Sequence, residues 1–350
     1  MIVDRRYRFA VLLCGLTLFF LAAPSFLSRY YLYLIGLILI TGLLATSLNM
    51  VLGFGGMYQF HHSVFYGVGA YSFALVSMKS GLPPAAGYVA APVMAALASL
   101  IIGLITIRLS KLYFGMLQLS LGSLVWAIVY RWYSFTGGDD GIHGINIPEA
   151  IDSTRGVYYF TLVVTIICLW LMFRMVNSPF GRIFQGIRDN PERTEAIGVN
   201  VKSHQLVGQV IAGTFAGIAG ALFVTVEVSV FPDLLFWTLS LELIIMCLLG
   251  GWYVFFGPML GAAMIVVLRT FVGIYTEYWT LVLGIVLFSL GEAAWSSRFL
   301  EYVADLAPHG RVGAYMGVAM LPWFLGLFIV LPVLGHATWH LYSLMQHAAE

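Results

Sequence analysis

Long runs of apolar residues, each about the length needed to cross a lipid bilayer, dominate this 350-residue sequence. A membrane helix needs about 20 mostly apolar residues, and helices satisfy their own backbone hydrogen bonds in lipid. Only 9% of the residues are charged, too few to cover a soluble surface, which carries about 25%. We therefore expect an all-α polytopic membrane protein with about 10–11 transmembrane helices. The predicted spans are 9–27, 31–52, 58–78, 87–107, 112–133, 157–176, 205–226, 235–252, 257–275, 279–295 and 319–340.

The distribution of lysine and arginine predicts the orientation. If the N-terminus is cytoplasmic and the spans alternate, twelve of the 17 basic residues fall in inside loops and five fall outside. Cytoplasmic loops carry such an excess. The first span, 9–27, lacks a clear cleavage site of small residues, so we interpret it as a retained helix. The span 58–78 is rich in Gly and His, so we expect it to be broken or re-entrant.

The motifs associated with catalysis do not occur in the sequence. There is no Cys-x-x-Cys, His-Glu-x-x-His, P-loop or Gly-x-Ser-x-Gly pattern. The three cysteines, Cys14, Cys168 and Cys247, lie inside apolar runs and are typical of small buried side chains. We expect neither catalytic residues nor a metal site, no enzymatic activity, and no nucleic-acid partner.

The most informative segment is the inside loop 177–204. Pro179 permits a helix to begin, and residues 180–189 have an apolar face opposite basic residues. A second short helix is predicted from Glu192 to Ile197, ended by Gly198. Such a helix either lies on the membrane surface or docks in a groove of a partner protein. The physical pattern alone favours the membrane surface.

A family resemblance changes that preference. The stretches Ser178–Arg182 (Ser-Pro-Phe-Gly-Arg) and Glu195–Val201 (Glu-Ala-Ile-Gly-Val-Asn-Val) resemble the coupling loop of permeases in the branched-chain amino acid ABC transporter family, LivM-like subunits in particular. The resemblance implies a type II-like ABC importer permease whose loop inserts into a cytoplasmic ATPase. The coupling residues that it implies are Pro179, Phe180, Gly181, Arg182, Arg188, Glu195, Ala196 and Gly198.

Further motifs follow in family order over about residues 30–290, and several motifs in order are a stronger signal than one. They include Leu48–Gly56, His62–Tyr71 and Thr136–Ile145. We therefore expect a permease domain at 1–290. Residues 291–350 form an atypical extension that resembles a late segment of major facilitator peptide transporters and adds one predicted helix.

The residues that we expect along the translocation path belong to these motifs. Their glycines indicate either close helix packing or a broken helix that lines the path, and both interpretations stay open. Glu242 lies inside a span, where a charge is costly, so it is either a structural hydrogen-bonding group or a solute contact. The candidate path residues are Gly53, Gly56, His62, Phe65, Gly69, Tyr71 and Glu242.

The resemblance implies a permease subunit that imports branched-chain amino acids or a related small polar solute, such as urea or an amide, across the bacterial inner membrane. Its implied partners are cytoplasmic ABC ATPase subunits, a LivH-like sister permease or a second copy, and a periplasmic solute-binding protein. This chain would bind no cofactor, because ATP would bind to the ATPase. The alternative is a secondary transporter driven by an ion gradient, in which Glu242 would be essential.

Overall fold

The structure is a computed structural model that describes residues 20, 22–109, 111–275 and 284. The chain divides into two compact units, Met1–Thr270 and Phe271–Glu350. In the second unit the described residues are 271–275 and Gly284, so the fold below is that of the first unit. The predicted spans 279–295 and 319–340, the boundary at residue 290 and most of the span 9–27 lie outside the described residues.

Eight long helices overlap eight of the predicted spans, and the all-α prediction is confirmed. Six of them are long and apolar enough to cross a membrane: α2, α4, α5, α7, α10 and α12. The less apolar helix α3 and the 14-residue helix α11 complete the set. The helices are α2 (Arg29–Leu52), α3 (His62–Lys79), α4 (Gly87–Thr106), α5 (Lys111–Arg131), α7 (Thr154–Val176), α10 (Val201–Glu227), α11 (Trp237–Gly250) and α12 (Gly257–Tyr275).

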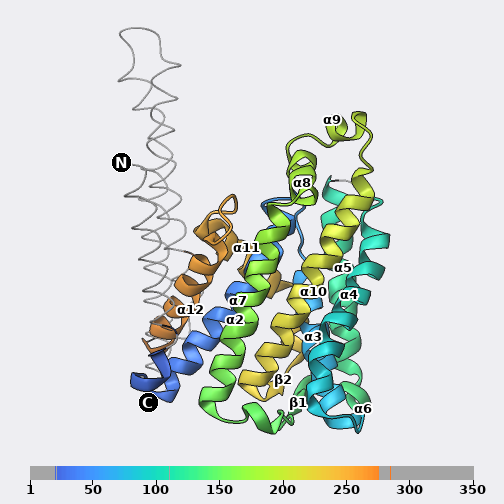
Figure 1. The fold of residues 1–350 in the computed structure, drawn as a ribbon. Helices are drawn as coiled ribbons and strands as arrows, with labels where there is room; N and C mark the ends of the chain where they lie inside the picture. Colours follow the sequence, from blue (N-terminus) through green and yellow to red (C-terminus); the bar gives the residue numbers. More distant parts are fainter. Residues whose placement is uncertain (1–19, 21, 110, 276–283, 285–350) are drawn as a thin grey trace, which may run out of the picture. The chain divides into compact units, whose positions relative to one another are not determined.

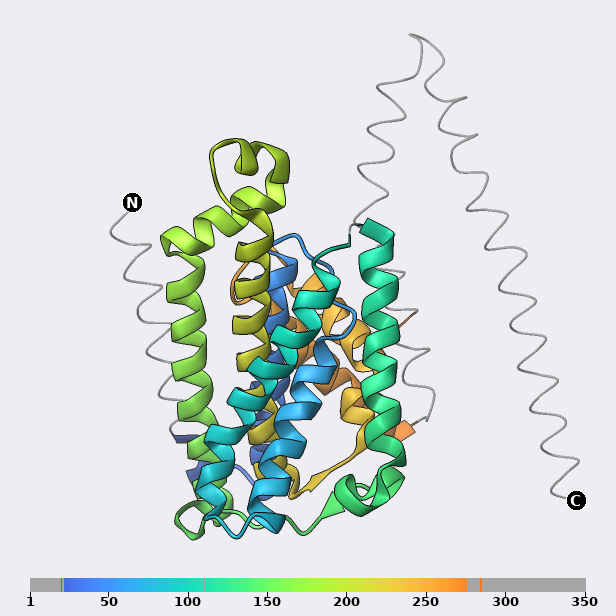
Figure 2. The same cartoon turned by 90° about the vertical axis from the view of Figure 1, so that its right-hand side faces the viewer.

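The central helix of the unit is α10, which packs against α2, α3 and α4. Small residues along α10 permit this close packing. A methyl group added at Gly217 would lie 2.4 Å from the Ala95 side chain of α4, and one added at Gly220 would lie 2.2 Å from the Tyr66 carbonyl oxygen of α3. In Figure 2, α7 (light green) and α5 (blue-green) form opposite sides of this group of helices.

The connecting elements gather at two opposite ends (Figure 1). One end carries the surface loop, with α8 (Pro179–Asp189) and α9 (Pro191–Ala196). The other end carries α6 (Tyr133–Thr136) and an antiparallel pair, β1 (Ile142–His143) with β2 (Ser229–Val230), in which Ile142 lies opposite Val230. The sequence did not predict this pairing. Short 3₁₀ turns complete the connections: η1 (Pro84–Ala86), η2 (Gly138–Asp140), η3 (Glu149–Ile151) and η4 (Pro232–Leu235).

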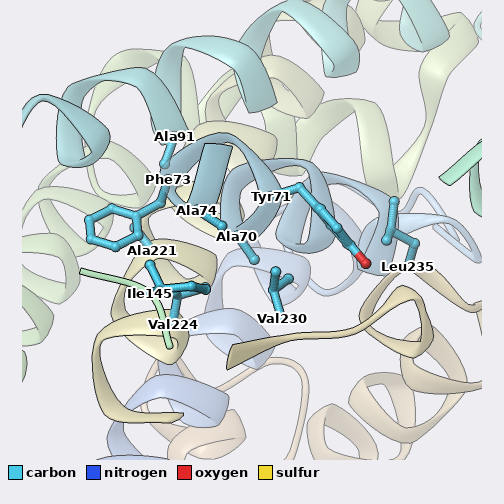
Figure 3. Close-up of a cluster of buried hydrophobic side chains, with 10 residues drawn as sticks. All are labelled: Ala70, Tyr71, Phe73, Ala74, Ala91, Ile145, Ala221, Val224, Val230 and Leu235. Atoms are coloured by element: carbon cyan, nitrogen blue, oxygen red, sulfur yellow. The ribbon is translucent and has the colours of Figure 1, made fainter. Parts of the chain in front are cut away.

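A cluster of buried hydrophobic side chains lies near the β1–β2 end and joins α3 to α4 and α10 (Figure 3). The Tyr71 side chain extends toward Leu235 (Figure 3).

At the β1–β2 end, the Tyr133 hydroxyl donates a hydrogen bond of 2.5 Å to the Asp139 carboxylate. This hydrogen bond raises the pKa of Tyr133 to about 12, because it favours the protonated phenol.

Several helix boundaries differ from the predicted ones. The span predicted at 58–78 begins only at His62, and residues 53–61, called the break below, are not helical. The span predicted from 205 begins at Val201, because the Asn200 side chain accepts a hydrogen bond from the Ser203 amide (3.0 Å) and caps the helix. The predicted loop 177–204 therefore includes the first turn of α10.

The two short loop helices also begin earlier than predicted. The Ser178 hydroxyl accepts from the Gly181 amide (3.3 Å) and begins α8 at Pro179. Asn190 ends α8 and caps α9 by accepting from the Arg193 amide (2.9 Å). The second helix ends at Ala196, one residue before the predicted Ile197.

Candidate functional site

The apolar face of α8 packs against its own chain. Phe184 and Ile187 are buried, and they cluster with Val51, Met57 and Val201. The Phe184 ring is in close contact with Gly55 of the break and with Gly208 of α10. The opposite face of α8, which includes Arg182, is exposed. The amphipathic pattern therefore attaches α8 to the end of the helix bundle.

Arg188 joins α8 to the break. Its Nη1 atom donates a hydrogen bond of 3.0 Å to the Gly53 carbonyl oxygen, and its guanidinium lies 5.0 Å from the centre of the Tyr253 ring. Gly56 has a φ of +68°, and a methyl group there would lie 2.8 Å from Arg188 Cγ. The structure thus brings together three of the residues singled out in the sequence, Arg188, Gly53 and Gly56.

The helix α9 projects from the same end as an exposed tip (Figure 1). Glu195, Ala196 and Gly198 are exposed, and Ile197 is 77% exposed. Gly198 has a φ of +90°, which a residue with a side chain rarely adopts and which turns the chain back toward α10. Three of the eight predicted coupling residues therefore lie on this tip.

The remaining predicted coupling residues lie on α8. Pro179 is its first residue, and the Phe180 ring stacks 5.7 Å from the rings of both Phe184 and His204. Gly181 is buried against the Val176 carbonyl oxygen, where a methyl group would lie 2.1 Å away. The loop therefore has an anchored part, α8, and a projecting part, α9.

Two adjacent histidines follow the break and differ in their surroundings. His62 is buried with both ring nitrogens hydrogen-bonded, to Ser47 Oγ (2.9 Å) and to Gln59 Oε1 (2.9 Å). His61 is equally buried, but its two ring nitrogens have no hydrogen-bond partner in the described part of the chain. The Phe65 ring lies 5.0 Å from the His61 ring and 5.8 Å from the His62 ring. His62 is thus held by two hydrogen bonds, whereas His61 interacts with the Gln118 side chain but makes no hydrogen bond within 3.5 Å in the described part of the chain.

The other predicted path residues do not join this group. Gly69 lies against the backbone of Gly217 in α10, as expected for close helix packing. Tyr71 belongs to the cluster near the β1–β2 end (Figure 3). Glu242 lies on α11, and Arg269 of α12 interacts with it electrostatically. The candidate residues are therefore distributed along α3 and α11 rather than gathered in one pocket.

Sequence reasoning missed several buried polar residues around the break. The Ser63 amide donates to Ser240 Oγ (2.9 Å), and the Ser240 hydroxyl donates to Ser63 Oγ (2.8 Å), which ties α3 to α11. The Gln118 Oε1 atom on α5 accepts from the Phe60 amide (3.1 Å). A polar residue inside an apolar span was the available signal, because such residues are costly in lipid.

Among the described residues, no group of three or more His, Cys, Asp or Glu side chains is placed to hold a metal ion.

A bundle of apolar helices with a non-helical break and an anchored surface loop is the structure of a multi-pass membrane protein. Residues 30–290 match the family described as the permease component of the branched-chain amino acid transport system. The chain belongs to this family, which confirms the resemblance and makes it a transport permease.

Three named relatives agree with this assignment. The chain is 26% identical over 299 residues to the high-affinity branched-chain amino acid transport system permease protein LivM of Escherichia coli (strain K12), which covers 78% of this chain and 70% of the relative. It is 28% identical over 304 residues to the protein of the same name from Salmonella typhimurium, with the same coverage. It is 26% identical over 283 residues to a probable branched-chain amino acid transport permease protein LivM of Methanocaldococcus jannaschii, covering 76% and 77%. No solved structure matches.

Proposed function

We propose that this permease is the transmembrane subunit of an ATP-driven importer for branched-chain amino acids or a related small polar solute, such as urea or an amide. The family and the names of the three relatives support the solute class. ATP would bind to a separate cytoplasmic ATPase and not to this chain. The α9 tip would be the surface on which that ATPase docks.

The observation that carries this proposal is the division of the loop into an anchored and a projecting helix. Phe184 and Ile187 hold α8 on the bundle, while α9 presents Ile197 at 77% exposure, beside Glu192, Arg193 and Glu195. An apolar side chain surrounded by charged residues suits the centre and polar rim of a protein–protein interface. Of the two sequence interpretations of the loop, this arrangement favours docking, because the apolar face of α8 contacts its own chain and not lipid.

The proposed coupling runs from the tip to the break. Movement of α9 would shift α8, and Arg188 would transfer that shift to Gly53 through its hydrogen bond. The break continues directly into the histidines at the start of α3, and His62 is fixed to Ser47 of α2. This is a continuous series of packed and hydrogen-bonded groups, which is the physical requirement for coupling between distant sites.

The assembly follows from the same proposal. The loop end would face the cytoplasm of a bacterial cell with the protein in its inner membrane, and the N-terminus would be cytoplasmic. The β1–β2 end would face a periplasmic solute-binding protein, and a LivH-like sister permease or a second copy would complete the path. Residues 1–290 would form the permease domain and 291–350 an extension.

The test replaces Ile197 with aspartate. A charge at this position would disrupt an apolar anchor without disturbing the fold, because the side chain is exposed. The matched control is Leu82→Asp, an exposed leucine in the turn between α3 and α4, at the β1–β2 end. The readouts are membrane abundance, the ATPase recovered with the tagged chain from the native host, and uptake of radiolabelled leucine by cells.

We expect Ile197→Asp to reduce ATPase recovery and leucine uptake at least tenfold, corresponding to about 1.4 kcal/mol of binding free energy, at unchanged abundance. Leu82→Asp is expected to leave ATPase recovery unchanged. Equal ATPase recovery for the two variants would contradict docking at α9. Leucine transport by the purified chain alone, driven by an ion gradient, would instead support a secondary transporter.

A further inference from the structure

We propose that the solute binds along the contact between α3 and α5, and that His61 and Gln118 are the side chains that form hydrogen bonds to it. This contact, called the α3–α5 seam, is defined by His61, Tyr71, Gln118 and Trp126. The inference rests on the proposed function in one respect, namely that this chain forms the solute path. It differs from the sequence prediction, which placed His62 on the path.

The first observation is a set of unpaired buried polar atoms along the seam. Among the described residues, no hydrogen bond within 3.5 Å reaches either ring nitrogen of His61, Gln118 Nε2, Trp126 Nε1 or the Tyr71 hydroxyl, although the Gln118 side chain interacts with the His61 ring. Buried polar groups in native proteins are nearly always paired, and an unpaired one requires an explanation. Other unpaired atoms among the described residues lie near the break or on α7 and α10.

The second observation is the position of these groups on α5. Gln118, Gly122 and Trp126 are spaced four residues apart, so they lie on one face of the helix over a length of about 12 Å. A methyl group added at Gly122 would lie 3.4 Å from His61 Cβ and 3.5 Å from Val64 Cγ2. Gln118 Oε1 accepts from the Phe60 amide, and the Gln118 side chain interacts with the His61 ring, although its Nε2 atom makes no hydrogen bond within 3.5 Å among the described residues. One face of α5 therefore places its polar groups against the start of α3.

The third observation is that α5 is poorly suited to be a lipid-facing helix. Of the six membrane-length helices it has the lowest mean hydropathy, yet it is also the least buried, at 11% of its residues. It stands at one side of the helix group, opposite α7 (Figure 2). It meets Phe60 of the break at Gly115, and His61 and Val64 at the start of α3 at Gly122, two positions that present no side chain. Because no side chains of α5 interlock with its neighbours at these two glycines, α5 can separate from α3 and admit a solute.

The chemistry of the seam selects the class of solute. An imidazole donates and accepts one hydrogen bond each when neutral, while the free amide nitrogen and the indole nitrogen donate. Apolar side chains, among them Val64, Phe65 and Val125, adjoin these groups. None of the four seam residues carries a fixed charge, so an ion entering without its own counter-charge would be left unpaired. The seam therefore suits a small solute of zero net charge with hydrogen-bonding groups and an apolar part, such as a zwitterionic aliphatic amino acid.

The first experiment compares Gln118→Leu and His61→Leu with Thr165→Val in cells that carry the complete transporter. Thr165 on α7 is a matched control, because its hydroxyl is also fully buried and unpaired but lies away from the seam. The readouts are the rate of radiolabelled leucine uptake, membrane abundance and ATPase recovery. Each seam variant is expected to lose at least tenfold in uptake with unchanged ATPase recovery, and Thr165→Val is expected to keep the wild-type rate.

The second experiment locks the seam without removing His61 or Gln118. Val64→Cys with Gly122→Cys places two thiols within reach of a disulfide, because Val64 Cγ2 lies 3.5 Å from a β-carbon built at Gly122. Oxidation is expected to stop leucine uptake by the double variant and reduction to restore it, while oxidation leaves the uptake rate of each single cysteine variant equal to its own reduced rate. Full uptake by the cross-linked protein would overturn the proposal.

The two proposals fail in distinguishable ways. A wild-type complex that takes up neither branched-chain amino acids nor urea or an amide would contradict the proposed function. Wild-type leucine uptake together with undiminished uptake in both Gln118→Leu and His61→Leu would overturn the seam and leave the proposed function standing.

Discussion

Replacing Arg188 with alanine should separate ATP hydrolysis from transport. The Arg188 side chain is 24% exposed and joins α8 to the break through the Gly53 carbonyl oxygen. The buried side chains Phe184 and Ile187 remain in the variant, so α8 is expected to stay folded on the bundle. The loop would then lose the directional contact with the break while keeping the α9 surface on which we expect the ATPase to dock.

The size of the effect follows from three contacts. A hydrogen bond from a charged donor contributes about 1.5–3 kcal/mol, and the cation–π contact with the exposed Tyr253 ring adds about 0.5–1 kcal/mol. The ion pair with Asp189 contributes about 0–1 kcal/mol, because Asp189 is 67% exposed and water screens the pair. The Asp189 pair lies within α8, so the attachment of α8 to the break and to Tyr253 should weaken by about 2–4 kcal/mol, or roughly 30-fold to 1000-fold in its equilibrium constant.

The assay measures ATP hydrolysis and leucine uptake in the same proteoliposomes containing the complete transporter. Arg188→Ala is expected to retain ATPase recovery and hydrolysis but to lower the leucine transported per ATP at least tenfold. Arg188→Lys should be intermediate, because lysine keeps the charge but loses the planar donor geometry. Asp189→Asn is the matched control, since it removes only the screened ion pair, and it should behave as wild type. An unchanged ratio of leucine to ATP in Arg188→Ala would refute the coupling route.

Two further predictions concern the fold. Gly69→Ala should lower the thermal unfolding midpoint in detergent, because its β-carbon would lie 2.4 Å from the Gly217 Cα of α10. The control Gly122→Ala should be tolerated, because its β-carbon would lie 3.4 Å from the His61 Cβ. Equal unfolding midpoints for the two variants would contradict this packing. Val228 has a φ of +56°, which a β-branched side chain disfavours, so Val228→Gly should stabilise the protein by about 1 kcal/mol, and a lowered unfolding midpoint would disprove this strain.

The sequence predicted the helices well and their long-range contacts poorly. Apolar runs predicted the eight helices that overlap the predicted spans, because the main requirement of a membrane helix is a long enough apolar segment. The start of α3 was wrong by four residues, since Met57, Tyr58 and Phe60 continue the apolar run although the chain turns at Gly56. Hydropathy does not distinguish an apolar turn from an apolar helix.

The candidate site shows the same limit. Local motifs predicted the loop, its two short helices and the glycines of the break. They could not predict that Arg188 contacts Gly53, 135 residues away, or that His62 makes two hydrogen bonds whereas His61 interacts with Gln118 and makes none within 3.5 Å in the described part of the chain. These distinctions depend on which side chains the fold places nearby, such as Ser47 and Gln59 around His62.

The β1–β2 pairing joins the two ends of the segment 142–230, and the α8–α9 tip lies at the opposite end of this segment. The two long helices of this segment, α7 and α10, both pack on α2, and α2 ends where the break begins. The longer of the two, α10, has 27 residues and extends about 40 Å. If α10 tilted by about 5° around its end at the sheet, its other end would move by about 3.5 Å. A rotation of this size at the sheet would therefore displace the α8–α9 end by more than the 3.0 Å length of the Arg188 hydrogen bond.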